Sequence, residues 1–316
     1  MEEATHIIDP EGEVIIILRS AAAPFAPWDE EIDEWPADEQ TADEPAVAEQ
    51  PEEANTDENP IEDCDEEGEA SKKGFRSESH IESGCYRIQV SAKHLMLPSP
   101  IFKRILTGPW KESHLLTEKG SVEIHATGWD LEAFLILMNI LHCQTQNLPQ
   151  EISLDLLAKV AVLTDYYGCH AVIRFLAKRW ILMLNASFPQ EYSRDSMLWM
   201  WVSWAMRLDS QFKQSTLLAI TQSDRIIRSL GLPIPVKVID AINSRREARI
   251  ASILFSLEDL RHDFLQGHRG CSFECSSIML GALTKHMHSN ALLSPEPVAP
   301  FSGWRFGVNE DDSSFS

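Results

Sequence analysis

The sequence predicts an α+β protein in which a small sheet packs with a cluster of helices and an all-helical region follows. Residues 13–18 (EVIIIL) form an apolar run typical of a buried strand. Tyr86, Ile88 and Val90 alternate with polar residues, as one face of a half-buried strand does. From residue 100 onward, apolar residues recur at helical spacing. We therefore expect residues 13–18 to pair with residues 86–90, with helices packed against the sheet.

Turn and capping residues set the order of the elements. The run Asp9-Pro10-Glu11-Gly12 predicts a turn before the first strand, and residues 121–125 alternate as a third strand. Ser99, Asp130 and Ser153 each stand just before an apolar helical pattern, so we expect them to cap helices. Gly168 is expected to end the helix that Ser153 begins, and a further helix to follow it.

Beyond residue 190 the pattern is helical throughout. The expected helices cover residues 194–208, 210–229, 235–265 and 275–293. Trp199, Trp201 and Trp204 lie in the first of them with several methionines, which indicates either a core or a partner-binding patch. Because their spacing is helical, we favour the core.

Charge divides the chain. Residues 1–84 carry 27 Asp and Glu against 4 Lys and Arg, a net charge of −23, while residues 85–316 carry 22 against 23, a net of +1. We expect residues 19–84 to be an acidic, disordered insertion, because ordering costs about 1–2 kcal/mol per residue and few apolar side chains offset it. Trp28, Ile32 and Trp35 interrupt it, and they indicate either a short adhesive motif or, as we favour, a weakly ordered flank.

The expected organisation is a first domain at 6–18 plus 85–185, a helical region at 186–294 and a flexible tail at 295–316. The acidic part repels nucleic acid and anionic membranes, so we expect neither as a partner. No apolar run reaches the roughly 18 residues of a membrane span, and the N-terminus lacks a secretory signal pattern. We expect a cytoplasmic or nuclear protein whose six cysteines are thiols.

Enzyme signatures are missing from the sequence, including nucleotide-binding glycine loops and the nucleophile and metalloprotease motifs. We therefore expect a protein that is not an enzyme and needs no cofactor. The run Asp63-x-Asp65-x-Glu67-Gly68 resembles the start of a calcium loop but has Gly74 where the loop needs Glu. The best metal-ligand spacing is His268, Cys271 and Cys275, with His286 or His288 as a fourth zinc ligand. The alternative is a loop with two ordinary thiols.

Several stretches together resemble a BTB/POZ domain of the fungal type. They are DPEGEVI at the start, YRIQV, SAKHLMLPSPIFKRIL, VEIHATGWDLEAFLILMNILH and LLAKVAVLTDYYGCHAVIRFLAKRWI. The resemblance covers residues 6–18 and 85–185 and rests on the linear order of the matches. It implies a non-enzymatic protein-interaction module whose partners are other proteins.

Two positions depart from the family pattern. The usual His ahead of the first helix falls on Ala92, with Lys93-His94 after it, and the common Asp of the first strand is Glu13. These positions form the charged pocket of repressor-type members, so that function is not expected here. The family's extra N-terminal helix has no match before the first strand, so a strand-swapped dimer is not expected either.

The resemblance also points to a contact surface at the end of the first long helix and the loop after it. Candidate contact residues are Phe102, Ile105, Leu106, Trp110 and Glu112. Trp110 follows Gly108-Pro109, so it either anchors a partner or folds back over the helix end. Three partners remain open. The chain could bind a cullin as a substrate adaptor of a ubiquitin ligase, serve as a scaffold in a transcription-associated assembly, or bind a second copy of itself.

Overall fold

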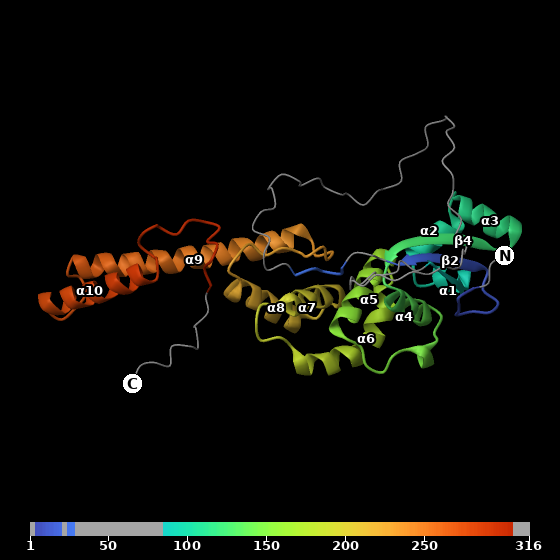
Figure 1. The fold of residues 1–316 in the computed structure, drawn as a ribbon, viewed down its shortest axis with the longest axis horizontal. Helices are drawn as coiled ribbons and strands as arrows, with labels where there is room; N and C mark the ends of the chain where they lie inside the picture. The colour runs from blue at the N-terminus through green and yellow to red at the C-terminus, as the bar shows by residue number, and fades with distance from the viewer. Residues whose placement is uncertain (1–3, 21–23, 29–84, 306–316) are drawn as a thin grey trace, which may run out of the picture.

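The computed structural model describes residues 4–20, 24–28 and 85–305. Within these residues the chain forms a mixed α+β structure, with a four-stranded sheet at one end and helices over most of its length (Figure 1). The expected α+β class is confirmed at this level.

The sheet joins strands from both sides of the acidic segment. Its order is β1-β3-β2-β4, formed by β1 (His6–Ile7), β3 (Cys85–Val90), β2 (Val14–Ser20) and β4 (Val122–Trp129). β2 pairs antiparallel with β3, placing Ile16 opposite Ile88, and parallel with β4. The predicted pairing across the acidic segment is therefore confirmed. Sequence analysis missed β1, which has only two residues.

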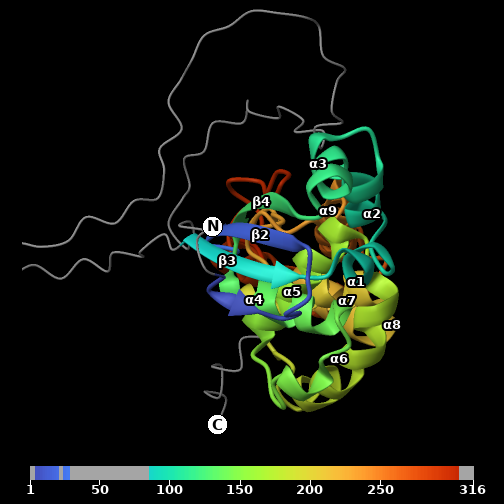
Figure 2. The same ribbon diagram turned by 90° about the vertical axis from the view of Figure 1, so that its right-hand side faces the viewer.

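Alternation along the strands directs one face into the core. In β4, Val122, Ile124 and Ala126 are buried while the residues between them are exposed. Successive strand residues point to opposite faces, so this pattern covers one side of the sheet with apolar side chains. β2 is buried more completely, because Ile17 is buried as well as Ile16. Figure 2 shows α4 and α5 on one side of this sheet.

Three helices lie between β3 and β4. They are α1 (Ala92–Met96), α2 (Pro100–Thr107) and α3 (Lys111–Lys119). The Ser99 side chain caps α2 by accepting a hydrogen bond from the Phe102 N–H at 3.1 Å, as expected. The loop expected after α2 is instead α3. None of its residues is buried, so the sequence carries no strong apolar stripe to reveal it.

Three further helices follow the sheet, with bounds close to the expected ones. They are α4 (Leu131–Leu141), α5 (Leu154–Tyr167) and α6 (His170–Leu184), with short 3-10 turns at Thr145–Asn147 and Asn185–Ser187. Asp130 caps α4 through Ala133 N–H, and Ser153 caps α5 through Leu156 N–H. Gly168 ends α5 in the left-handed conformation, with φ of 68°.

Helices α7 (Arg194–Met206) and α8 (Asp209–Gln222) continue the same core. Trp199 and Trp201 of α7 are each 1% exposed, and the Trp201 indole donates a hydrogen bond to the Ala158 carbonyl of α5 at 3.2 Å. The core interpretation is confirmed for both, whereas Trp204 is 42% exposed. One continuous core thus crosses the boundary expected near residue 185.

Residues 24–28 pack on this core, which corrects the expectation that order stops at residue 18. Arg194 donates hydrogen bonds to the carbonyls of Phe25 and Ala26, and Trp28 meets Tyr192 edge-on with ring centroids 5.3 Å apart. Arg194 also pairs with Asp155. The aromatic side chains of this segment pack on apolar residues of the core, and Arg194 binds the backbone beside them. Composition alone does not reveal this packing. The rest of the expected insertion, residues 29–84, lies outside the described residues.

The C-terminal region is a long helical hairpin. α9 (Val236–Leu265) and α10 (Phe273–Ser289) pack side by side and extend away from the sheet (Figure 1). α9 ends where predicted and begins one residue later than predicted, whereas α8 ends earlier than expected, at Gln222.

The segment after α10 returns to the base of α9, so the tail expected at 295–316 is held in part. The Arg246 guanidinium is 1% exposed and donates hydrogen bonds to the carbonyls of Pro300, Phe301 and Trp304, and to that of Ser223. Phe301 is itself buried. A guanidinium group has several N–H donors in a fixed plane and can bond several carbonyls at once, which explains how one arginine side chain holds this turn.

Among the described helices, none combines the length and apolar character needed to cross a membrane.

Candidate functional site

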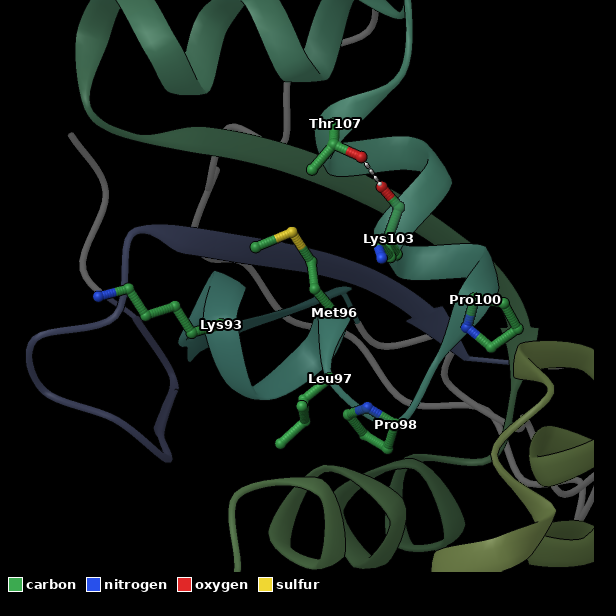
Figure 3. A pocket seen from close by; sticks show the side chains of 7 residues that line it. All are labelled: Lys93, Met96, Leu97, Pro98, Pro100, Lys103 and Thr107. Atoms are coloured by element: carbon green, nitrogen blue, oxygen red, sulfur yellow. Dashed lines mark hydrogen bonds between the residues drawn. The ribbon is translucent and has the colours of Figure 1, made fainter.

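An open groove lies at the corner where α1 turns into α2. It has a volume of about 530 Å³ and is lined by Lys93, Met96, Leu97, Pro98, Pro100, Lys103 and Thr107. Figure 3 shows Leu97 and Pro98 side by side at the turn, with Met96 extending toward α2. All of the lining residues belong to one short stretch of chain, so the groove depends on how α1 and α2 are fixed to the body.

Backbone groups at the start of α1 are held by the side chains of Glu13, just before β2, and of His142, the C-cap residue of α4. The Ser91 N–H donates to His142 Nε2 at 2.9 Å, and the Ala92 N–H donates to the Glu13 carboxylate at 3.0 Å. Leu95 is fully buried beneath the helix. These contacts leave Met96 partly buried against the core and turn Leu97 outward, where it is 88% exposed.

The start of α2 is fixed to α5 by Ser99. Its hydroxyl donates a hydrogen bond to the Tyr167 carbonyl at 2.7 Å while it caps α2. The Phe102 ring stacks on Tyr167 with centroids 4.4 Å apart and an interplanar angle of 6°. The Pro100 ring lies against Gly168, where a Cβ would come within 3.1 Å of it. α2 therefore has one face fixed in the core and the opposite face free.

The groove offers apolar contact area with positive charge. Met96, Leu97, Pro98 and Pro100 supply the apolar lining, and Lys93 and Lys103 supply ammonium groups. The Thr107 hydroxyl is already used, because it donates to the Lys103 carbonyl at 2.7 Å (Figure 3). The lining contains no carboxylate, thiol or imidazole for acid–base or nucleophilic chemistry. This arrangement suits binding of an apolar segment that carries negative charge.

The His142 side chain links the start of α1, beside the groove, to the end of α4. Its Nδ1 is 2.8 Å from the Met138 carbonyl and its Nε2 accepts from Ser91, so both contacts are satisfied by the neutral ring with its proton on Nδ1. Burial lowers the pKa of His142, and the nearby His94 lowers it further, against opposing contributions from Met138 and Asp9. A protonated ring would turn Nε2 into a donor and lose the Ser91 contact.

The predicted contact residues divide between core and surface. Phe102 and Leu106 are 1% and 3% exposed, so these two are core residues that a partner does not reach, which corrects their assignment. Ile105 is partly buried against the core. The prediction chose the apolar face of α2, but that face turns inward, whereas Lys103 and Thr107 on the other face line the groove.

Trp110 and Glu112 remain accessible at the start of α3. Trp110 is the N-cap residue of this helix and is 41% exposed, and Glu112 lies in its first turn. A Cβ built on Gly108 would come within 2.9 Å of the Trp110 ring, so the indole leans over Gly108. The side chain thus combines both alternatives considered for it, since it partly covers the end of α2 and still exposes one face.

The metal candidates do not converge. Cys271 and Cys275 are neighbours at the start of α10, but His286 is eleven residues beyond Cys275 on the same helix, roughly 16 Å along its axis. His288 lies farther still. His268 Nδ1 is instead 3.7 Å from the Asp263 carboxylate. Among the described residues, no group of three or more His, Cys, Asp or Glu side chains is placed to hold a metal ion.

A charged cluster beside residues 24–28 escaped the sequence analysis. Lys159 bonds to the carboxylates of Asp130 and Asp155 at 3.1 and 3.0 Å, and Asp155 also pairs with Arg194. Burial opposes ionisation of Asp155, but hydrogen bonds from Arg194 and Lys159 outweigh it and lower its pKa. The spacing of Asp155 and Lys159, four residues apart on one helix, was a usable signal. The calcium-like run at Asp63 and the residues Ile32 and Trp35 lie outside the described residues.

No protein-family model matches the sequence. No curated protein matches it either.

Proposed function

We propose that the chain is a non-enzymatic protein-interaction module with a BTB/POZ-like fold, and that its groove over α1 and α2 binds an acidic segment with apolar side chains from a partner protein. One observation carries this proposal: Leu97 is 88% exposed in a groove whose charged groups are both lysines.

The order of elements supports the BTB/POZ-like part of the proposal. The antiparallel pair β2 and β3 is followed by α1, α2 and α3, then by β4 parallel to β2, then by α4, α5 and α6. The sequence resemblance named the same stretches in the same order. The inserted acidic segment falls between the paired strands β2 and β3.

Exposed apolar side chains support the docking role of the groove. Single exposed apolar residues are common on protein surfaces, but here Leu97 joins Met96, Pro98 and Pro100 around one concave surface. The two prolines have no backbone N–H and restricted backbone dihedrals. A partner therefore meets a surface that loses little conformational entropy on binding.

Electrostatics favour an acidic partner. Lys93 and Lys103 are exposed lining residues, and the groove contains no carboxylate to neutralise them. An acidic segment approaching this surface would be attracted by both ammonium groups, and the attraction would weaken in salt because exposed charges are screened. Catalysis is not proposed for the groove, since its side chains offer no acid–base pair.

The test uses the full chain and a short labelled peptide made of Asp and Glu with two Trp. Fluorescence anisotropy should show saturable binding that weakens as salt is raised. Leu97→Asp should weaken it roughly tenfold or more, because it removes the most exposed apolar contact and adds a repulsive charge. Leu182→Asp is the matched control, since Leu182 is 75% exposed on α6, away from the groove residues. Equal binding by Leu97→Asp and the unaltered chain, or no binding at all, contradicts the proposal.

A second candidate function, substrate adaptor of a cullin-based ubiquitin ligase, is favoured by the exposed Trp110. Trp110 and the first-turn Glu112 stand together at the start of α3, where the resemblance expects a cullin contact. Trp110→Ala and Glu112→Lys should each abolish capture of purified cullin without lowering the melting temperature. A Trp110→Ala variant that melts earlier but still captures cullin would make the residue structural only.

A further inference from the structure

The loop between α9 and α10 brings two thiols together at the tip of the helical hairpin. Cys271 is exposed and directly precedes Ser272, the N-cap of α10, while Cys275 is partly exposed in the first turn of that helix. Figure 1 shows this end of the hairpin far from the sheet. The function proposed above does not involve these residues.

Asp263 fixes the loop from the α9 side. Its carboxylate accepts a hydrogen bond from Arg269 Nε at 2.9 Å and lies 3.7 Å from His268 Nδ1. Its backbone carbonyl accepts from the His268 N–H at 3.0 Å. Contacts from both the side chain and the backbone hold the chain just before Cys271, so the position of that residue does not depend on α10 alone.

Gly270 presses the loop against α10. Its φ is 106°, and a Cβ at this position would come within 3.0 Å of the Ser276 backbone nitrogen. The left-handed conformation and the close approach both favour glycine. Ser276 in turn donates its hydroxyl hydrogen bond to the Phe264 carbonyl of α9. Cys271 is thereby set opposite the first turn of α10, where Cys275 lies.

The start of α10 lowers the pKa of the Cys275 thiol. The Cys271 backbone is the largest cause and the Cys271 side chain the next, while burial acts in the opposite direction. Hydrogen bonds to a thiolate at a helix N-terminus stabilise the nucleophilic form. Cys169 shows the contrast, because burial raises the pKa of its thiol to about 12.

We propose that Cys271 and Cys275 form a thiol–disulfide exchange site, in which Cys275 attacks a low-molecular-weight disulfide and Cys271 resolves the product. Cys271 directly precedes the N-cap Ser272 and Cys275 lies in the first turn after it, so both thiols stand at the same end of α10, and neither is buried. The incoming disulfide therefore reaches Cys275 from solvent, and the resolving thiol lies on the loop that Gly270 holds against the first turn of α10.

The exchange balances in two steps. The Cys275 thiolate attacks one sulfur of the disulfide RSSR, forming a mixed disulfide and releasing one thiolate RS⁻. Cys271 then loses its proton to solvent and attacks the Cys275 sulfur, which forms the Cys271–Cys275 bond and releases the second RS⁻. The two cysteine thiols are oxidised by two electrons in total, and RSSR is reduced to two RSH.

The first measurement compares alkylation rates of cysteines within the same full-length chain. Limiting iodoacetamide at pH 7, followed by peptide mass spectrometry, should label Cys275 roughly threefold or more faster than Cys143, which is exposed outside the hairpin. Equal rates for these two cysteines would overturn the assignment of Cys275 as the attacking thiol.

The second measurement follows oxidation by glutathione disulfide. The unaltered chain should form the Cys271–Cys275 disulfide, and Cys271→Ser should instead retain the mixed disulfide on Cys275. Cys143→Ser should behave as the unaltered chain does. Gly270→Ala should slow ring closure several-fold with an unchanged circular-dichroism spectrum, since it moves Cys271 away from α10. A persistent mixed disulfide in the unaltered chain, or a disulfide joining two chains, would overturn the resolving role of Cys271.

Discussion

The body of the molecule and its α9–α10 hairpin differ in where they place their large apolar side chains. In the body, Phe134 and Trp199 are almost completely buried. On the hairpin, Phe255, Phe273 and Ile278 are 74%, 83% and 70% exposed. Burying a large apolar side chain contributes about 1.5–3 kcal/mol, so the stability of the body comes mainly from its core. The stability of the hairpin comes instead from the contacts between α9 and α10 and from the hydrogen bonds of the loop that joins them. Its large apolar side chains on the outer surface remain exposed to solvent.

The largest expected difference comes from one substitution made in both regions. Ile16→Asp places a charge at a fully buried position between β3 and β4, and should destabilise the body by about 4 kcal/mol or more, enough to unfold it. Ile278→Asp on the exposed side of α10 should leave the melting temperature nearly unchanged. Thermal melts followed by circular dichroism test both, and a stably folded Ile16→Asp variant would contradict the sheet topology.

Arg246 tests the joint between the two regions, that is, the contact of the base of α9 with the Ser223 carbonyl and with the C-terminal turn around Phe301. Arg246→Met removes a buried guanidinium that satisfies carbonyls on both sides of the joint, and should cost about 2–4 kcal/mol. It should also make the chain near Phe301 sensitive to limited proteolysis. Arg245→Met is the matched control, because Arg245 is exposed one residue earlier. Equal stability of the two variants would show that the C-terminal turn is not held by this clamp.

Residues 24–28 allow a smaller test of the body. Trp28→Ala should destabilise it by about 1–3 kcal/mol through loss of the Tyr192 contact, while Phe273→Ala on the hairpin should have no measurable effect.

Replacing residues 31–80 with a neutral Gly/Ser linker should leave stability unchanged, since their composition predicts little buried area. Chemical denaturation measures all three, and a large loss with the linker would mean that the acidic residues contribute to the fold.

The smallest expected effect is a pH dependence at His142. Burial lowers its folded-state pKa below 6.5, so the unfolded chain binds the proton more readily. The stability contributed by the neutral ring is present above pH 6.5 and is lost as pH falls toward the folded-state pKa. His142→Gln should flatten the fall in melting temperature between pH 7 and 5, whereas His288→Gln on the hairpin should not. Identical profiles for all three proteins would contradict this linkage.

Local signals were sufficient to predict much of the fold. Ser99, Asp130 and Ser153 each mark a helix start because a side-chain oxygen must satisfy a free backbone N–H there. The split pairing of β2 with β3 was predictable because an apolar strand needs a partner. α1 was missed because it has only five residues, and α3 because it buries no residue that would give it an apolar period.

Long-range contacts account for the remaining differences. The arginines Arg194 and Arg246 bind backbone carbonyls far away in the sequence, and nothing local distinguishes them from surface arginines. The candidate site shows the same limit. The stretch around α2 was identified, but the choice between its faces depends on Tyr167 of α5 stacking on Phe102. That contact fixes Phe102 inside and leaves Lys103 at the groove.

The central claim is that the groove over α1 and α2 selects the partners of this chain. It is tested most directly by proximity labelling with the full chain fused to a biotin ligase, expressed as the unaltered form, Leu97→Asp and Leu182→Asp. The account predicts that a defined set of labelled proteins is shared by the unaltered chain and Leu182→Asp and is lost with Leu97→Asp at equal expression. The same labelled set from all three forms would contradict it.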